Sequence, residues 1–388
     1  MLKLGKFSVF LLILSAFVNT GCDALLKAAA AQKQATGQVP ARAKTLTLPA
    51  NKDRIYTLNY APGPIFNPTV NPWGTRYKDY IFDSWDVTTE YYKKNDPNYK
   101  GGGDNLIMDI FTPKNDPERG RPCVIYVFGG GFASKIDDCT QEVVKGMVEK
   151  GYVVAATDYR IGFNGQYTVM ACQGDFNADM YPAFLRAIQD LRDAVRYLKA
   201  NAERLGIDKS KIFIGGQSAG ALTSLAVGYV EDKDIDPNLL KVVGGSLDYG
   251  GSNLKENVSV AGVYSLSGAI VQPSVLQKSS KTPLLLIHGT QDDLVNPNVG
   301  AVFKCVGKNP TFPKVAGGNA IYEVMHTRVP IRLELVCKGG HGMGTVGYPK
   351  LLDLISTFTY SVLQGNPITG KEIIEAAVPV RQDNSLCK

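Results

Sequence analysis

The segment that decides the fold is KIFIGGQSAGALTSLAV, residues 211–227. It begins as an apolar run typical of a buried strand and ends as a run of helix-forming residues. Between them lies Gly216-Gln217-Ser218-Ala219-Gly220, a G-x-S-x-G motif. Side chains in place of its glycines would collide with the neighbouring strand and helix in so tight a turn. The order strand, motif, helix therefore predicts a turn that presents Ser218 at the carboxyl edge of a sheet; the alternative is an ordinary turn that contains a serine.

Short apolar segments alternate with amphipathic ones over most of the remaining chain. This alternation is typical of an α/β fold with a mostly parallel central sheet and helices on both faces. A long helix is expected at 181–205, where apolar residues recur at spacings of three and four before Gly206, and another at 348–363. The expected strands are 105–111, 123–128, 152–158, 211–215, 258–267, 283–288 and 331–336, with a further strand-like segment at 77–91.

We expect a single domain over residues 51–388, with its core at about 104–365. Two segments within it, 162–180 and 231–256, are rich in Gly, Asn and Asp and follow neither the helical nor the strand pattern. They are either variable surface loops or a rim or lid that shapes a substrate pocket.

The first residues have the pattern of a secretory leader. Two lysines precede an apolar run over residues 7–18, which is too short to span a membrane comfortably, and small residues follow it. We therefore expect a signal peptide at 1–21, a tether at 22–50, and an exported protein. Cys22 resembles a bacterial lipoprotein site, so a lipid on Cys22 would be the one membrane contact; the alternative is an ordinary cleaved leader.

Charge and cysteine content narrow the class of protein further. The formal charge is +6, or +4 without the two leader lysines, and no basic stripe is present, so we expect no nucleic-acid partner. Without Cys22, six of the seven cysteines remain, enough for up to three disulfides in an oxidising compartment, and we favour Cys139 with Cys172. No two cysteines have the C-x-x-C spacing, so we expect no metal site, and we expect no cofactor.

A glycine run follows another apolar segment upstream. After residues 124–128 comes Gly129-Gly130-Gly131-Phe132. Without Cβ atoms, the backbone N–H groups of such a loop can approach a developing negative oxygen. A phosphate-binding loop is disfavoured because no Gly-Lys-Ser/Thr follows. The remaining alternative is a glycine-rich turn after a core strand.

Three segments together resemble one known family. Gly129-Gly130-Gly131-Phe132, Asp158-Tyr159-Arg160 and residues 217–221 are similar to the carboxylesterase branch of the α/β-hydrolase superfamily, and the resemblance covers about 104–365. Classical large carboxylesterases are longer and use Glu as the acid of their triad. This chain is more similar to compact exported bacterial esterases.

The resemblance implies where an oxyanion would bind. Its donors would be the N–H groups of Gly130, Gly131 and Ala219. Many relatives have His where this chain has Phe128. Because the donors are backbone groups, we expect this difference to change how the loop is braced without disabling it.

The acid and the base should follow the serine in that order. His288-Gly289-Thr290-Gln291-Asp292 is similar to the family's H-G-x-x-D segment, which implies Asp292 as the acid, with Asp293 as its competitor and His288 as a brace of the turn. Of the chain's three histidines, His341 lies in a flexible loop directly after the expected last strand, where an imidazole can reach both Ser and Asp. His326 is expected on the surface.

These features predict a serine hydrolase that cleaves carboxylic esters through a Ser218–His341–Asp292 triad and an acyl-enzyme. The substrate would be a small-molecule or polymer-linked ester, and family association suggests short-chain, acetyl or feruloyl esters. The alternatives are a serine peptidase of the same fold and a non-catalytic binding protein on this scaffold. Dienelactone hydrolase and dehalogenase chemistry are disfavoured because Ser, not Cys or Asp, occupies position 218. The oligomeric state is left open.

Overall fold

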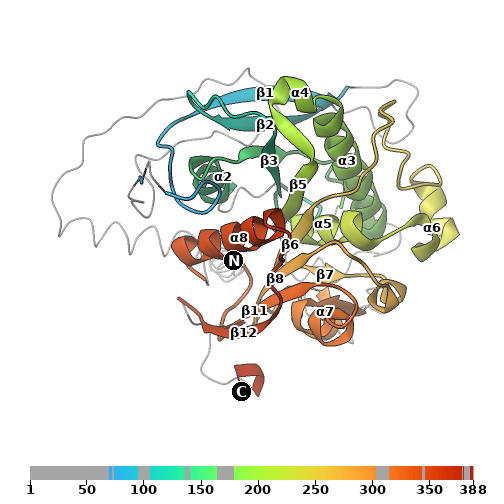
Figure 1. The fold of residues 1–388 in the computed structure, drawn as a ribbon. Coiled ribbons are helices and arrows are strands. Elements are labelled where there is room, and N and C mark those ends of the chain that lie inside the picture. Colours follow the sequence, from blue (N-terminus) through green and yellow to red (C-terminus); the bar gives the residue numbers. More distant parts are fainter. Residues whose placement is uncertain are drawn as a thin grey trace, which may run out of the picture.

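A nine-stranded sheet forms the centre of the molecule (Figure 1). The computed structural model describes residues 70–71, 74–94, 105–135, 140–163, 179–302, 314–342, 346–377, 379 and 385–387. Within these residues the strand order is β1-β2-β4-β3-β5-β6-β8-β11-β12. The pairs from β4 to β12 are parallel, whereas β1 and β2 are antiparallel. The strands are β1 Trp85–Lys93, β2 Leu106–Pro113, β3 Arg121–Val127, β4 Val153–Thr157, β5 Ile207–Gln217, β6 Gly262–Leu266, β8 Leu284–Gly289, β11 Ile331–Cys337 and β12 Gly370–Glu375.

Helices cover both faces of this sheet (Figure 1). One face packs against α2 (Thr140–Glu149) and α8 (Tyr348–Leu363). The other packs against α3 (Tyr181–Ala200), α5 (Ala219–Tyr229) and α7 (Gly318–Met325). A small antiparallel sheet and short helices complete the described residues: β7 Ala269–Ile270, β9 Val299–Ala301, β10 Lys314–Gly317, α4 Ala202–Leu205, α6 Pro237–Val242, η3 Asp232–Asp234, η4 Pro273–Gln277 and η7 Ser385–Cys387.

Strand β3 shows why the central strands have continuous apolar sequences. Cys123, Ile125 and Val127 point into the core beneath α3 and α5. Val124 and Tyr126 point into the core beneath α2 and α8. A strand that is buried on both faces needs apolar residues at every position, not at alternate ones. The mostly parallel α/β architecture is therefore confirmed.

Several predicted boundaries were wrong for identifiable reasons. The strand expected at 77–91 begins only at Trp85, because Tyr77 lies in a turn with φ of 71°. The strand expected at 258–267 begins at Gly262. The helix expected at 181–205 breaks into α3 and α4 at Asn201, which has φ of −105° and ψ of 14° and whose amide donates to Tyr197 O. Its expected end is confirmed, since Gly206 has the left-handed φ of 66°.

The segment 231–256 packs against α3. Gln189 of α3 donates to both Val243 O and Ser246 O at 2.8 Å, and Arg192 pairs with Asp248 at 2.9 Å. Leu247 is fully buried in the core. These contacts anchor the segment to the scaffold, and a role as a lid stays a prediction.

Some predictions lie outside the described residues. These are the leader at 1–21, the tether at 22–50, Cys22, the pairing of Cys139 with Cys172, and residues 164–178 of the other loop segment. In the part of the chain that is described, no helix combines the length and the apolar character needed to cross a membrane.

Candidate active site

Ser218 lies in a strained turn between β5 and α5. Its φ of 54° and ψ of −120° are unfavourable for a residue with a side chain. Its N–H donates to Leu266 O at 2.9 Å, which ties the turn to β6. Cβ atoms added at Gly216 and Gly220 would lie only 2.0 and 2.1 Å from Val127 O. The predicted reason for both glycines, close packing of the turn against a neighbouring strand, is therefore confirmed.

The glycine loop after β3 lies beside this serine. A Cβ on Gly129 would lie 3.5 Å from Ser218 Cβ. Gly130 and Gly131 have φ of 125° and 56°, which favour glycine. Among the described residues, their N–H groups have no acceptor within the protein. Ala219 begins α5, and the first N–H groups of a helix lack acceptors inside it. Three candidate donors thus lie on the two segments that meet at Ser218.

An aromatic stack braces the glycine loop. The Phe128 and Tyr159 rings are 4.2 Å apart and inclined by 11°, and Tyr159 Oη donates to Phe128 O at 3.3 Å. On the other side of the glycines, Phe132 O accepts from the N–H groups of Gly162 and Phe163 at 2.9 and 3.0 Å. The expectation that Phe128 changes the bracing is consistent with these contacts, because ring stacking holds the strand end where many relatives have a histidine.

Asp292 and His341 form a close pair. Asp292 Oδ2 lies 2.8 Å from His341 Nδ1, while Oδ1 accepts from the N–H groups of Leu294 and Val295 at 3.0 and 2.8 Å. All four residues come from the segments that follow β8 and β11. The competing Asp293 is exposed, so the pairing with His341 belongs to Asp292.

The charge state of Asp292 fixes the orientation of the imidazole. Burial alone would raise the pKa of Asp292, but the charge of His341 and the hydrogen bonds from His288 and His341 outweigh it and hold the pKa well below its usual range. A carboxylate can only accept hydrogen bonds, so Nδ1 of His341 carries the proton. Nε2 is then the basic nitrogen.

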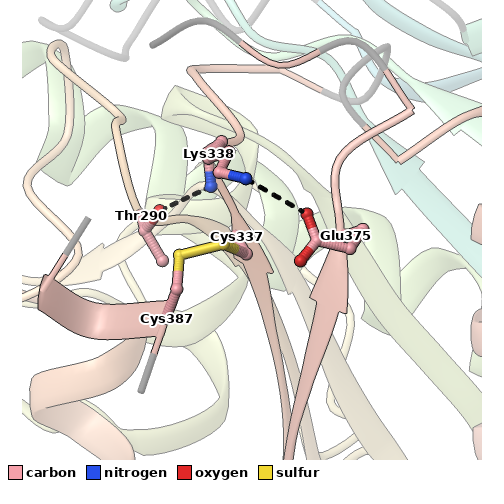
Figure 2. Close-up of a disulfide and its surroundings, with 5 residues drawn as sticks. All are labelled: Thr290, Cys337, Lys338, Glu375 and Cys387. Atoms are coloured by element: carbon pink, nitrogen blue, oxygen red, sulfur yellow. Dashed lines mark hydrogen bonds and ion pairs between the residues drawn. A yellow bond between two sulfur atoms is a disulfide. The ribbon is translucent and has the colours of Figure 1, made fainter. Parts of the chain in front are cut away.

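The segment after β11 that carries His341 (residues 338–342, the base loop) and the segment after β8 that carries Asp292 (residues 290–295, the acid loop) are joined by hydrogen bonds. Lys338 N donates to Thr290 Oγ1 at 2.9 Å (Figure 2), and Gln291 N donates to Gly339 O at 2.8 Å. A Cβ on Gly289 would lie 2.3 Å from Gly340 O, which shows how closely the loops pack. The position of His341 is therefore coupled to that of Asp292 beyond their direct hydrogen bond.

The far end of the base loop returns to the nucleophile turn. Gly342 N lies 3.5 Å from Ser267 Oγ, and Ser267 follows the residue that accepts from Ser218 N–H. A Cβ on Gly342 would lie 3.1 Å from Nε2 of Gln217, the residue before Ser218. The structure thus brings the residues flanking His341 and Ser218 together. Sequence reasoning missed Ser267, since no local pattern links it to a loop 75 residues further along.

A disulfide lies at the start of the base loop. Cys337, the last residue of β11, is bonded to Cys387, and Lys338 Nζ lies 3.9 Å from Glu375 (Figure 2). Cys123 is a free thiol whose pKa burial raises to about 12. Because Cys123 is free, the other five of the six cysteines can form at most two disulfides within one chain, so the upper limit of three among these six is too high. The two bonded residues are separated by 50 positions, so the sequence offered no signal for this pairing.

We expect Cys387→Ser to lower the free energy of unfolding by about 2–4 kcal/mol, because the disulfide no longer restricts the unfolded chain. Urea unfolding of wild type and variant measures the difference. With dithiothreitol present, the two proteins should unfold at closely similar urea concentrations. Equal stability of the two proteins without reductant would contradict the prediction.

The two other histidines have the places expected for them. His326 follows α7, is exposed, and its ring contacts Tyr322 O at 2.9 Å. His288 is buried at the end of β8, directly before the turn that carries Asp292. Within the described part of the chain, no group of three or more His, Cys, Asp or Glu side chains is arranged to hold a metal ion.

A mostly parallel sheet with a strained serine after β5 and an Asp–His pair after β8 and β11 is the arrangement typical of the α/β-hydrolase fold. Residues 108–270 match the family model described as BD-FAE. The chain is also similar to a solved esterase of Thermogutta terrifontis with propionate bound, with a TM-score of 0.51 and 18% identity over 73% of this chain and 96% of that one. The chain has the α/β-hydrolase fold.

Curated relatives of known name are similar over shorter stretches. Esterase B1 of Culex pipiens is 28% identical over 31% of this chain and 21% of its own length. Chlorogenic acid esterase of Aspergillus niger is 29% identical over 34% of this chain and 26% of its own length. Fumonisin B1 esterase of Sphingopyxis macrogoltabida is 27% identical over 30% of this chain and 22% of its own length. The chain thus spans about a fifth to a quarter of the length of these relatives, and within that span it is similar to esterases.

Proposed function

We propose that the protein is a serine esterase in which Ser218 is the nucleophile, His341 the general base and Asp292 the acid. The observation that carries this proposal is the 2.8 Å pair of Asp292 and His341 on a loop whose next residue lies against the nucleophile turn. Gly130, Gly131 and Ala219 supply the oxyanion donors. The esterase names of the relatives support the choice of carboxylic esters as substrates.

Acylation uses all of these groups. Nε2 of His341 takes the proton from Ser218 Oγ as that oxygen attacks the ester carbonyl. The carbonyl oxygen becomes an oxyanion, which the loop N–H groups and the amino-terminal end of α5 stabilise. The tetrahedral intermediate then expels the alcohol, which receives the proton from His341.

Deacylation repeats these steps with water. His341 removes a proton from water, which attacks the acyl-enzyme, and the second tetrahedral intermediate releases the carboxylic acid as Ser218 regains its proton. Throughout, Asp292 fixes the imidazole tautomer and stabilises the imidazolium. Losing one oxyanion donor would cost about 10²–10³ in rate.

We propose a small-molecule or polymer-linked ester as the substrate and export as the route to it. The charged and apolar first residues support a signal peptide at 1–21, followed by a tether at 22–50, with Cys22 as a lipid attachment site. The Cys337–Cys387 disulfide also supports an oxidising compartment.

Activity against paired substrates tests this proposal. We expect p-nitrophenyl acetate and longer p-nitrophenyl esters, methyl ferulate or acetylated xylan to be cleaved faster than aminoacyl p-nitroanilides. Faster cleavage of the anilides would indicate a peptidase instead. A fluorophosphonate probe should label the protein, and an unlabelled, inactive protein would indicate a non-catalytic binding protein.

A further inference from the structure

His288 is a buried histidine beside the candidate acid. It lies in β8, one residue before the end of the strand, and is only 1% exposed. Its Nδ1 accepts from Gly318 N–H at 3.1 Å, at the start of α7. A ring nitrogen that accepts a hydrogen bond carries no proton, so in the neutral imidazole the proton is on Nε2.

This Nε2–H faces two acceptors. Val295 O lies 2.9 Å from Nε2, and Asp292 Oδ2 lies 3.3 Å from it. Asp292 Oδ2 is also the oxygen that His341 Nδ1 contacts at 2.8 Å. One carboxylate oxygen therefore lies between two imidazoles, His341 from the loop after β11 at 2.8 Å and His288 from β8 at 3.3 Å.

We propose that His288 is a positioning residue that acts on His341 through Asp292, an inference that rests on the proposed function. Its Nε2–H holds Oδ2 in place opposite the two backbone donors to Oδ1. It also takes up part of the negative charge of Oδ2, so the carboxylate attracts a proton on His341 less strongly. His288 thereby keeps His341 available as a base at lower pH.

Three ion pairs on the neighbouring elements are formed by the charged residues that the structure describes there. His341 and His288 both lower the pKa of Asp292 against the effect of burial. On β11, Glu334 lies 2.7 Å from Arg332. On α7, Glu323 lies 2.9 Å from Lys371 of β12, and at the base loop Lys338 lies 3.9 Å from the exposed Glu375. None of the residues in these three pairs takes the place of His288 beside Asp292.

Two substitutions separate positioning from simple bracing. In His288→Asn, the amide oxygen can take the place of Nδ1 and accept from Gly318 N–H, while the donor to Asp292 is lost. In His288→Gln, the amide N–H can take the place of Nε2 and donate to Asp292, while the acceptor for Gly318 is lost. The exposed His326→Asn is the matched control.

The readout is the titration of His341, which imidazole NMR can follow because the chain has three histidines. We expect His288→Asn to move the titration midpoint of His341 up by about 0.5–1 pH unit, since the carboxylate becomes more negative. The acidic limb of kcat/KM should move by the same amount, with kcat reduced about tenfold and KM little changed. His288→Gln should restore the midpoint, and His326→Asn should leave it unchanged.

An unchanged His341 midpoint in His288→Asn, with lower thermal stability, would overturn the proposal and leave His288 a structural brace. If the variant does not fold, wild-type spectra still decide, because a proton on Nδ1 of His288 would exclude donation to Asp292. The NMR titration does not depend on turnover. A wild type that cleaves no ester would therefore refute the proposed function while the coupling of the two histidines is still measured.

Discussion

Ser218→Ala is expected to reduce kcat for p-nitrophenyl acetate by about 10³–10⁶, because no other group can form the acyl-enzyme. The fold should be preserved, since alanine adopts the φ of 54° with about the same strain as serine. The turn keeps its N–H bond to Leu266 O, which does not involve the side chain. Initial rates and circular dichroism measured on one preparation test both statements.

Ser210→Ala is the matched control for this variant. Ser210 lies on the same strand, β5, but is exposed near its opposite end, where its hydroxyl donates to Asp208. Wild type and Ser210→Ala should both hydrolyse the ester and react with a fluorophosphonate probe, whereas Ser218→Ala should do neither. Undiminished turnover in Ser218→Ala would place the nucleophile elsewhere.

The parts of the site that could be predicted from the sequence are those whose structure is determined by contacts between residues close together in the chain or by the burial of one strand. The glycines around Ser218 follow from contacts within one turn and its adjoining strand, so the spacing of the motif is sufficient to indicate them. Likewise, β3 is recognisable because burial on both faces requires an uninterrupted apolar run. Each of these signals depends on a few consecutive residues.

The parts that were missed depend on contacts between distant segments. The bond of Cys337 to Cys387 and the approach of Gly342 to Ser267 join positions 50 and 75 residues apart, and nothing in the local sequence encodes either. The contact of His288 with Asp292 joins residues that are only four positions apart in the sequence. It was still missed, because the direction of the imidazole depends on Gly318 at the start of α7.

The resemblance implied Asp292 as the acid, but the local sequence left Asp293 as its competitor, and the structure distinguishes the two. Both are acidic residues in one turn, and their order in sequence says little about which faces His341. Asp292 is buried with both oxygens occupied, whereas Asp293 is exposed. Because folding lowers the pKa of Asp292, its ionisation stabilises the folded protein above about pH 4, the pKa of an unfolded aspartate. That contribution is lost as the pH falls through the lower folded value.

Asp292→Asn should therefore lower kcat for ester hydrolysis by about 10⁴. The amide oxygen can still accept from the N–H groups of Leu294 and Val295, so the turn should keep its shape. The amide nitrogen then faces His341 Nδ1, and a donor there favours the tautomer with its proton on Nε2, which cannot accept the proton of Ser218.

Asp293→Asn is the control at the neighbouring position and should retain near wild-type activity. Steady-state kinetics on both variants at pH 7, with melting temperatures measured between pH 3 and 7, separate the catalytic loss from the loss of stability. The deficit in melting temperature of Asp292→Asn should be largest near pH 7 and shrink below about pH 4, since the unfolded aspartate of the wild type then binds a proton that the folded carboxylate does not. A large loss of kcat in Asp293→Asn together with a mild one in Asp292→Asn would reassign the acid to Asp293.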